Sequence, residues 1–307
     1  MTHNREDRPG RVLVTGATGF LGRAVVNELT ARGRPVRVAV RHDPGDWPAG
    51  VDIAVVGDLG PDTDWSAALE GIDAVVHCAA RAHVLNETAT DPLTVFRRAN
   101  AEAAVHLGRQ AAQADVRRVV FISSIGVNGR ETHGVPFTAH DAPAPHSPYA
   151  VSKHEAEQGL TAVAAETGLE VVTIRPPLIT GPDAKGNLGT LARWIGRGLP
   201  LPFGLVNGNR RDLVSRDRLA ALISDCLDHP AAAGQTFLVS DGAPVSTRGL
   251  LLDMAAAMGT KARLIPVPPA LLGSALCLAG KEAMRSQLLG DLEIDITHTR
   301  DTLGWRP

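Results

Sequence analysis

The chain has 307 residues, a formal net charge of −2 and a pI near 6.6, so nothing in its charge favours nucleic acid or an anionic membrane. Its cysteines, Cys78, Cys226 and Cys277, are odd in number and scattered, which favours a reducing compartment over a disulfide framework. Because Met1 to Gly10 is polar and the histidines are dispersed, we expect a cytoplasmic α/β protein without signal peptide, membrane span or metal site.

The first predicted element is the short apolar run Arg11 to Thr15, which is typical of a buried parallel strand. A glycine-rich sequence follows directly, Gly16-Ala17-Thr18-Gly19-Phe20-Leu21-Gly22, and then an amphipathic helix to about Arg32. Glycines permit a tight turn and let backbone N–H groups approach a pyrophosphate at the start of a helix. Glycine turns are common, but one placed between a strand and a helix predicts a nucleotide site.

The second predicted strand, Val36 to Val40, should end beside the ribose of such a nucleotide. Folds that bind NAD often place an acid there, on the ribose 2′-hydroxyl. Here Arg41 follows Val40 and could meet a 2′-phosphate instead. The alternative is a solvated Arg41 with Asp43 on the ribose. We therefore expect NADP(H) or NAD(H), with a preference for NADP(H).

Further short apolar runs alternate with helical segments, which indicates a doubly wound parallel sheet of Rossmann type. The predicted strands are Val51 to Val56, Asp73 to His77, Val119 to Ile122 and Val171 to Ile174, and a long helix runs from about Asp91 to Ala114. Ligands of such sheets bind beyond the carboxyl ends of the strands. The residues that should fall at this edge include Gly16, Asp58, Ala79, Ser124 and Pro176.

Tyr149, the only tyrosine of the chain, stands four residues before Lys153. Ser147 can cap a helix and Pro148 suits its first position, so the tyrosine and the lysine should share one helix face. A nearby cation favours the phenolate and makes the hydroxyl a usable acid or base. The alternative is a surface helix that begins with an aromatic residue.

The pattern changes after Gly181, where segments become short and rich in glycine and proline. Helical pieces near Leu191 to Arg197, Thr247 to Met258 and Pro269 to Gly280 predict a smaller, mostly helical substrate unit. We place the boundary at residues 1–180 and 181–307, and expect residues 212–240 to return to the first domain. The apolar segment Leu271 to Leu278 is interpreted as core or as a homodimer contact, not as a membrane anchor.

Ordered motifs run along the whole chain: TGxxGxxG (Thr15 to Gly22), GDL (Gly57 to Leu59), HCAA (His77 to Ala80), Asn100, SS (Ser123, Ser124), YxxxK (Tyr149, Lys153), RPP (Arg175 to Pro177) and Leu303 to Pro307. With this set the chain resembles an extended short-chain dehydrogenase/reductase. Within that group it is similar to the nucleotide-sugar epimerase/dehydratase family, in the branch of UDP-glucose 4-epimerase-like proteins and UDP-4-keto-sugar reductases.

The resemblance implies a role for each matching residue. Tyr149 would exchange a proton with a sugar oxygen, Lys153 would lower its pKa and hold the nicotinamide ribose, and Ser124 would bind the reacting oxygen. The remaining cofactor contacts implied are Gly16, Thr18, Gly19, Phe20, Leu21, Gly22, Arg41, Asp58, Leu59, Ala79, Ala80 and Pro176. A UDP-sugar would meet Asn187 and Arg211 at its diphosphate and Phe203 at its uracil.

Departures from the family pattern narrow the reaction. Dehydratases place Asp-Glu where this chain has Ile125 and Gly126, and neither can act as an acid or base. Epimerases of this family usually carry an acid where this chain has Val40. The family also usually has a tyrosine where this chain has Asn128. We therefore expect an enzyme that reduces a UDP-4-keto-6-deoxy-N-acetylhexosamine for surface polysaccharide. The alternatives are a UDP-hexose 4-epimerase and, more remotely, a non-catalytic NADP-binding regulator.

Overall fold

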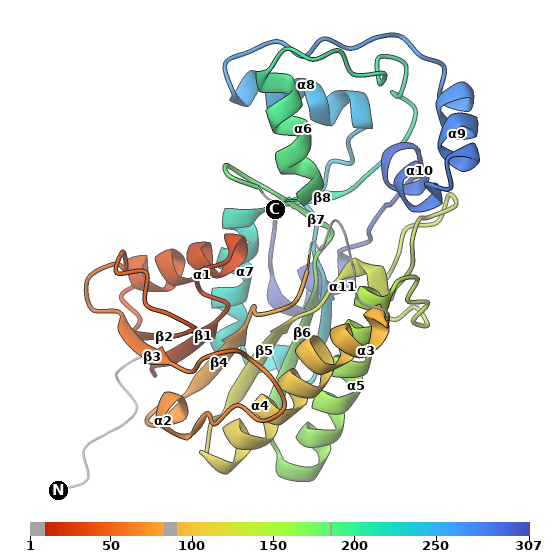
Figure 1. The fold of residues 1–307 in the computed structure, drawn as a ribbon. Helices are drawn as coiled ribbons and strands as arrows, with labels where there is room; N and C mark the ends of the chain where they lie inside the picture. Colours follow the sequence, from red (N-terminus) through yellow and green to blue (C-terminus); the bar gives the residue numbers. More distant parts are fainter. Residues whose placement is uncertain (1–9, 83–90, 185) are drawn as a thin grey trace, which may run out of the picture.

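The computed structural model describes residues 10–82, 91–184 and 186–307, and its main body is built on one parallel sheet (Figure 1). The strand order is β3-β2-β1-β4-β5-β6-β9, with every pair parallel. The strands are β1 (Val12–Thr15), β2 (Val36–Val40), β3 (Asp52–Val55), β4 (Ala74–His77), β5 (Arg118–Ile122), β6 (Glu170–Arg175) and β9 (Thr236–Leu238). The predicted Rossmann-type sheet is confirmed. The order reverses between β1 and β4, where such sheets bind ligands.

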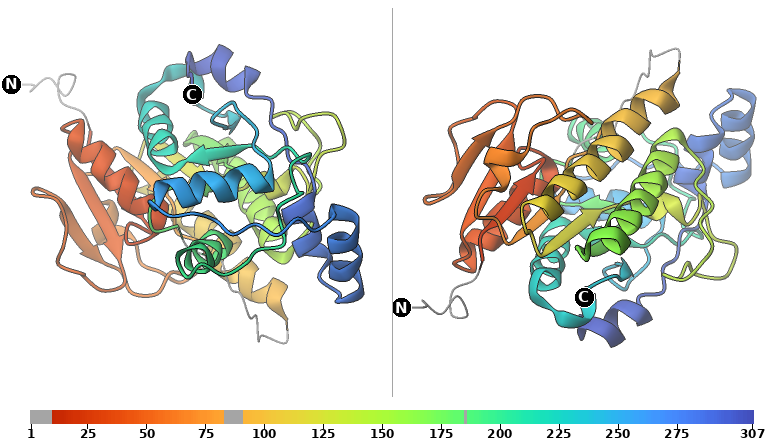
Figure 2. Two further views of the ribbon diagram at one scale, coloured as in Figure 1. Left: turned by 90° about the horizontal axis from the view of Figure 1, so that it is seen from above. Right: turned by 90° about the horizontal axis from the view of Figure 1, so that it is seen from below.

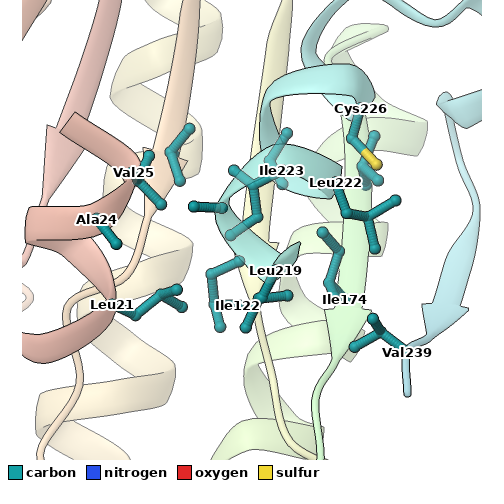
Figure 3. Packing of buried hydrophobic residues seen from close by; sticks show 14 of the residues in the cluster. Leu21, Ala24, Val25, Ile122, Ile174, Leu219, Leu222, Ile223, Cys226 and Val239 are labelled. Carbon is teal, nitrogen blue, oxygen red and sulfur yellow. The ribbon is translucent and has the colours of Figure 1, made fainter. Parts of the chain in front are cut away.

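Helices cover both faces of the sheet because successive residues of a strand point to opposite sides. Val12 and Val14 pack toward one layer and Leu13 toward the other. The first layer is α1 (Phe20–Ala31), α7 (Arg216–Asp228) and α11 (Thr297–Leu303), and the second is α2 (Ser66–Leu69), α4 (Ala103–Gln113) and α5 (Pro148–Thr167). Figure 3 shows Leu21 and Val25 of α1 facing Leu219 and Ile223 of α7.

The long helix predicted from Asp91 to Ala114 is divided into three parts. It comprises α3 (Pro92–Phe96), a π-helical stretch (Arg97–Glu102) and α4. Asp91 caps it as an N-cap, accepting a hydrogen bond from the Thr94 amide at 3.2 Å. A π-helical insertion is rare and often marks a functional site, and here it contains Asn100.

A smaller unit lies over the carboxyl edge of the sheet (Figures 1 and 2). It contains α6 (Gly186–Gly196), α8 (Thr247–Ala257), α9 (Pro269–Leu278) and α10 (Glu282–Leu289), and a two-stranded parallel sheet, β7 (Leu178–Thr180) with β8 (Leu213–Ser215), lies beneath them. Its own core includes Ile195, Phe203 and Leu251. Between these segments the chain returns to the main body, where α7 packs in the core on one face of the sheet and β9 forms its last strand.

Helix α9 is apolar but none of its residues is buried. Leu271 is 65% exposed and Leu278 is 91% exposed, so the segment is not the core element that was one of its two interpretations. Among the described residues, no helix combines the length and apolarity needed to cross a membrane. The N-terminal segment Met1 to Gly10 falls, apart from Gly10, outside the described residues.

Candidate active site

The glycine loop between β1 and α1 has no room for a side chain at positions 16 and 22. Gly16 has a φ of +64°, and a Cβ on it would lie 2.6 Å from the Ala79 amide nitrogen at the end of β4. A Cβ on Gly22 would lie 2.2 Å from the Gly16 carbonyl oxygen, and the Gly19 amide donates to that oxygen at 2.9 Å. Only glycine fits at positions 16 and 22, because any larger residue would collide with backbone atoms.

The loop delivers free amides to the start of α1. The N-cap residue, Gly19, provides no side-chain cap, and the Arg23 amide makes the first bond into the helix, to the Gly19 carbonyl at 3.0 Å. The amides of Phe20, Leu21 and Gly22 therefore precede the helical ladder, and the first turn carries no acidic residue. Thr18 lies exposed beside them. This cradle fits the pyrophosphate of a dinucleotide, because helix N-termini attract anions.

The predicted ribose and adenine contacts meet at the ends of β2 and β3. The Arg41 Nη1 atom lies 3.3 Å from Asp58 Oδ1, and the two side chains are 70% and 90% exposed. Asp43, the alternative ribose ligand, accepts hydrogen bonds from the Gly45 amide at 2.8 Å and the Trp47 indole at 3.1 Å, and so stabilises its own loop. An ion pair this exposed contributes little, so both charges can rearrange around a ligand. Leu59 is partly buried and packs against the core on the face of the sheet that α2, α4 and α5 cover.

The end of β4 is joined to β1 by a buried side-chain pair. Thr15 Oγ1 lies 2.8 Å from His77 Nδ1, and the Ala79 amide donates to Thr15 Oγ1 at 3.3 Å. Burial lowers the pKa of His77 to about 3, helped by the positive charge of Lys153, so its ring is neutral. This side-chain pair fixes the ends of β1 and β4 relative to each other, and the glycine loop lies beside both. Ala80 lies exposed just beyond.

Tyr149 stands at the start of α5, where the sequence predicted it. Ser147 accepts a hydrogen bond from the Ala150 amide at 3.2 Å, and Pro148 occupies the first turn. The Tyr149 ring packs edge-on against Phe96 with 6.1 Å between centroids. The helix cap and this aromatic contact hold the phenol at the carboxyl edge of the sheet.

Lys153 lies one turn further along α5 and is almost fully buried. Its Nζ lies 4.3 Å from the centroid of the Phe121 ring. Burial lowers the pKa of Lys153 to about 8, while Cys78 and Glu157 oppose the shift. Burial raises the pKa of Tyr149 to about 12. Desolvation thus shifts the phenol in the direction opposite to the lowering that we expected from Lys153.

Ser124 follows β5 and begins a short 3₁₀ turn (Ile125–Val127) that packs on the start of α5. Its Oγ accepts a hydrogen bond from the Gly126 amide at 3.1 Å. A Cβ on Gly126 would lie 3.3 Å from both Ser124 Oγ and Ala150 Cβ, and 3.5 Å from the His146 ring. A side chain at position 126 would therefore need Ser124 or Ala150 to shift by a few tenths of an ångström. The Pro176 carbonyl accepts a hydrogen bond from the Ile125 amide at 3.0 Å and fixes the turn from the neighbouring strand.

Asn100, in the π-helical stretch, is buried and fully engaged. Its Oδ1 accepts from the Arg81 amide at 2.7 Å, and its Nδ2 donates to the Arg81 carbonyl at 3.2 Å and to Ser152 Oγ at 3.0 Å. It therefore ties the chain after β4 to α5 between Tyr149 and Lys153.

A buried polar network under α5 was missed by sequence reasoning. Glu157 accepts hydrogen bonds from Ser123 Oγ and, at 2.9 and 2.6 Å, from Nε and Nη2 of Arg175. Arg175 also donates to Asn128 Oδ1 at 3.0 Å. The signal available in the sequence was the i, i+4, i+8 series Tyr149, Lys153 and Glu157, which lies on one helix face.

The predicted substrate contacts all lie in the smaller unit or at its base. Asn187 Nδ2 donates to Gln287 Oε1 at 2.9 Å and joins α6 to α10. Arg211 donates to the carbonyls of Ser286 at 3.2 Å and Gly290 at 2.9 Å. Phe203 is only 5% exposed and belongs to the core of the unit. The structure thus places Asn187 and Arg211 around α10, and the Phe203 ring among apolar neighbours.

This fold and site are those of an enzyme of the short-chain dehydrogenase/reductase type. The model of the NAD dependent epimerase/dehydratase family matches residues 12–240. A UDP-glucose 4-epimerase from Vibrio cholerae is 43% identical over 97% of this chain and 91% of its own length. A 2-alkyl-3-oxoalkanoate reductase from Stenotrophomonas maltophilia is 32% identical over 81% and 76%. The solved structure of MoeE5 with UDP-glucuronic acid and NAD has a TM-score of 0.77 and 25% identity, over 97% and 93%.

The chain belongs to the NAD dependent epimerase/dehydratase family. The resemblance drawn from its motifs is confirmed, and so is the conclusion that it is an enzyme.

Proposed function

We propose that this enzyme interconverts UDP-linked hexoses by inverting the configuration at C4, with NAD retained between turnovers. The observation that carries the proposal is the placement of Tyr149 and Lys153 on one face of α5, with Lys153 interacting with Cys78, which lies against Gly16 of the glycine loop. The 43% identity to a UDP-glucose 4-epimerase supports the reaction. The free cysteines of this chain suit a reducing compartment such as the cytoplasm.

In this proposal the bound nicotinamide supplies hydride transfer at C4, and the chain supplies everything else. The glycine loop and the amides of Phe20 to Gly22 hold the cofactor pyrophosphate. The Tyr149 hydroxyl takes and returns the proton of the C4 oxygen, while Ser124 Oγ donates a hydrogen bond to that oxygen. The Lys153 ammonium holds the nicotinamide ribose and favours the phenolate. Asn187 and Arg211 hold the diphosphate at the base of the smaller unit.

Reduction of a UDP-4-keto sugar by NADPH is the second candidate, and it rests on one observation. Strand β2 ends at the buried, apolar Val40, with the guanidinium of Arg41 beside it at 70% exposure. This rim offers a cation to a 2′-phosphate and suits a cofactor that leaves after each turnover. Asp58 argues against this second candidate, because its carboxylate faces the same guanidinium and would repel a 2′-phosphate.

One purification separates the two candidates. We expect protein prepared without added cofactor to carry NAD near one equivalent per chain, measured after acid release. It should also interconvert UDP-glucose and UDP-galactose, or their N-acetyl forms, without net change in nicotinamide absorbance. Protein that arrives empty and consumes NADPH stoichiometrically with a UDP-4-keto sugar would be a reductase. If neither assay shows turnover, the result would favour the third hypothesis, a non-catalytic NADP-binding regulator.

A further inference from the structure

We infer that Arg216 binds the pyrophosphate of the cofactor, adding a cation to the backbone cradle of the glycine loop. The inference rests on the dinucleotide site described above and extends it to α7, an element outside the recognised motifs.

Helices α1 and α7 lie side by side and run in the same direction. Their carboxyl-terminal ends are joined by Arg32 Nη1 and Asp225 Oδ1 at 2.6 Å. At their amino-terminal ends, the Arg216 guanidinium lies 5.2 Å from the centroid of the Phe20 ring. Both helices therefore begin at the carboxyl edge of the sheet, and Arg216 begins α7 next to the residue that begins α1.

The stem of Arg216 is held in place by packing. A Cβ on Gly181, at the end of β7, would lie 3.2 Å from the tip of the Phe20 ring and 3.3 Å from Arg216 Cβ. The glycine thus lets the ring and the stem close on one another. Only 22% of the Arg216 side chain is exposed, although it carries a full charge. A charged side chain ordered in this way, at the edge of a ligand site, is well placed to meet an anion.

The charges around Arg216 leave it able to bind. Its ion pair with Asp217, at 2.9 Å, uses Nε, and Asp217 is itself 77% exposed. Asp241 faces a different group, since it accepts from the Ser215 amide at 3.0 Å and lies 3.4 Å from Arg218. Within the part of the chain that the structure describes, this contact leaves the two terminal nitrogens of Arg216 available to a ligand, and arginine can present both to one phosphate.

The glycine cradle gives a physical reason for this cation. Its donors are the neutral amides of Phe20, Leu21 and Gly22, and α1 has no basic residue before Arg23, whose guanidinium donates to Asp46 at 2.9 Å and stacks on Trp47. A pyrophosphate brings two negative charges, which helix dipoles compensate only partly. Arg216 is the cation that packs against the loop's own side chain, the Phe20 ring.

The test compares ligands that contain the pyrophosphate with ligands that lack it. We would titrate nucleotide-free protein with NADH, ADP-ribose, adenosine and UDP, using Arg216→Met to keep the stem over Phe20 without its charge. We expect the Kd for NADH and for ADP-ribose to rise about tenfold, which corresponds to about 1.4 kcal/mol. The Kd for adenosine and for UDP should stay unchanged. The affinity of the variant for NADH should also depend less on salt.

Two further variants make the result specific. Arg216→Lys should recover part of the affinity, and Arg218→Met, which removes a cation two residues away, should bind all four ligands like the wild type. Equal losses for adenosine and NADH would mean that Arg216 acts only through the fold. A loss confined to UDP would place its charge on the substrate diphosphate, and unchanged binding would overturn the inference. Wild-type protein that binds neither NADH nor ADP-ribose would contradict the cofactor site itself.

Discussion

At the scale of single residues, burial sets the chemistry of the catalytic pair. Desolvation lowers the pKa of Lys153 to about 8 and raises that of Tyr149 to about 12, so both groups move toward their neutral forms. Near neutral pH the lysine still carries most of its charge and the phenol keeps its proton. The pair is therefore set to donate a proton from the phenol, and proton transfer in the reverse direction requires the phenolate to be stabilised.

Replacing Tyr149 by phenylalanine tests the proton transfer. Tyr149→Phe keeps the ring against Phe96 and removes only the hydroxyl, so we expect folding and NADH binding to persist. Turnover should fall about 10²- to 10⁴-fold, the usual contribution of a general acid or base. Steady-state kinetics and a cofactor titration on the same preparation would measure both. Wild-type turnover in this variant would contradict the assignment.

Several of these residues could be predicted from the sequence, because local rules place them. A glycine loop after a buried strand, a capped helix and an i, i+4 pair are each fixed by neighbours in the chain. The contact between Arg41 and Asp58 and the burial of Phe203 were not predictable in this way. They depend on tertiary contacts between segments far apart in the chain, and local patterns in a single sequence do not predict such contacts.

At the scale of elements, α5 is fastened to the sheet by charge as well as by packing. Glu157 on α5 and Arg175 at the end of β6 are both more than 90% buried, and their carboxylate and guanidinium meet edge to edge. A buried ion pair adds little net stability, but removing one partner leaves the other charge unpaired in an apolar site. The pair therefore fixes where the catalytic helix lies relative to the strand ends.

Neutralising one member of this pair should destabilise the protein strongly. We expect Glu157→Gln to lower the free energy of unfolding by about 3 kcal/mol, because Arg175 stays charged and loses its counter-ion. Urea unfolding followed by circular dichroism would measure the change. The double variant Glu157→Gln/Arg175→Met should regain much of the loss, since neither member of the pair then carries an uncompensated charge. A single variant as stable as wild type would show that solvent reaches the pair.

Most helices and strands of the main body follow from hydrophobic periodicity and turn residues, which is why their approximate bounds were predictable. The π-helical stretch was not, because Arg97 to Glu102 is ordinary helical sequence and the extra residue per turn is stabilised by tertiary contacts of Asn100. The pairing of β7 with β8 was equally hidden. Each strand has only three residues, and α6 and a long loop separate them in the chain.

At the scale of the whole molecule, the smaller unit is tied to the sheet by segments far apart in sequence. The Arg211 amide donates to the Val245 carbonyl at 2.9 Å, and the Leu292 amide donates to the Arg210 carbonyl at 2.8 Å. The Thr132 amide donates to the Asp291 carbonyl at 2.9 Å, which brings in the loop that leads to Tyr149. The substrate unit and the catalytic helix thus share one connecting region, and Arg211 lies within it.

Arg211 and its neighbour Arg210 offer a matched pair of variants for this region. The half-buried Arg211 binds two carbonyls at the end of α10, whereas Arg210 is 57% exposed and pairs with Glu293. We expect Arg211→Ala to raise the KM for the UDP-sugar about tenfold with little change in kcat, because a diphosphate contact made equally in ground and transition states is uniform binding. The loss of its carbonyl partners should also lower the unfolding free energy by about 1 kcal/mol. Arg210→Ala should change neither quantity appreciably, since exposed ion pairs contribute little. A collapse of kcat at unchanged KM in Arg211→Ala would instead place this arginine in the chemical step, and equal effects in the two variants would assign both to the connecting region.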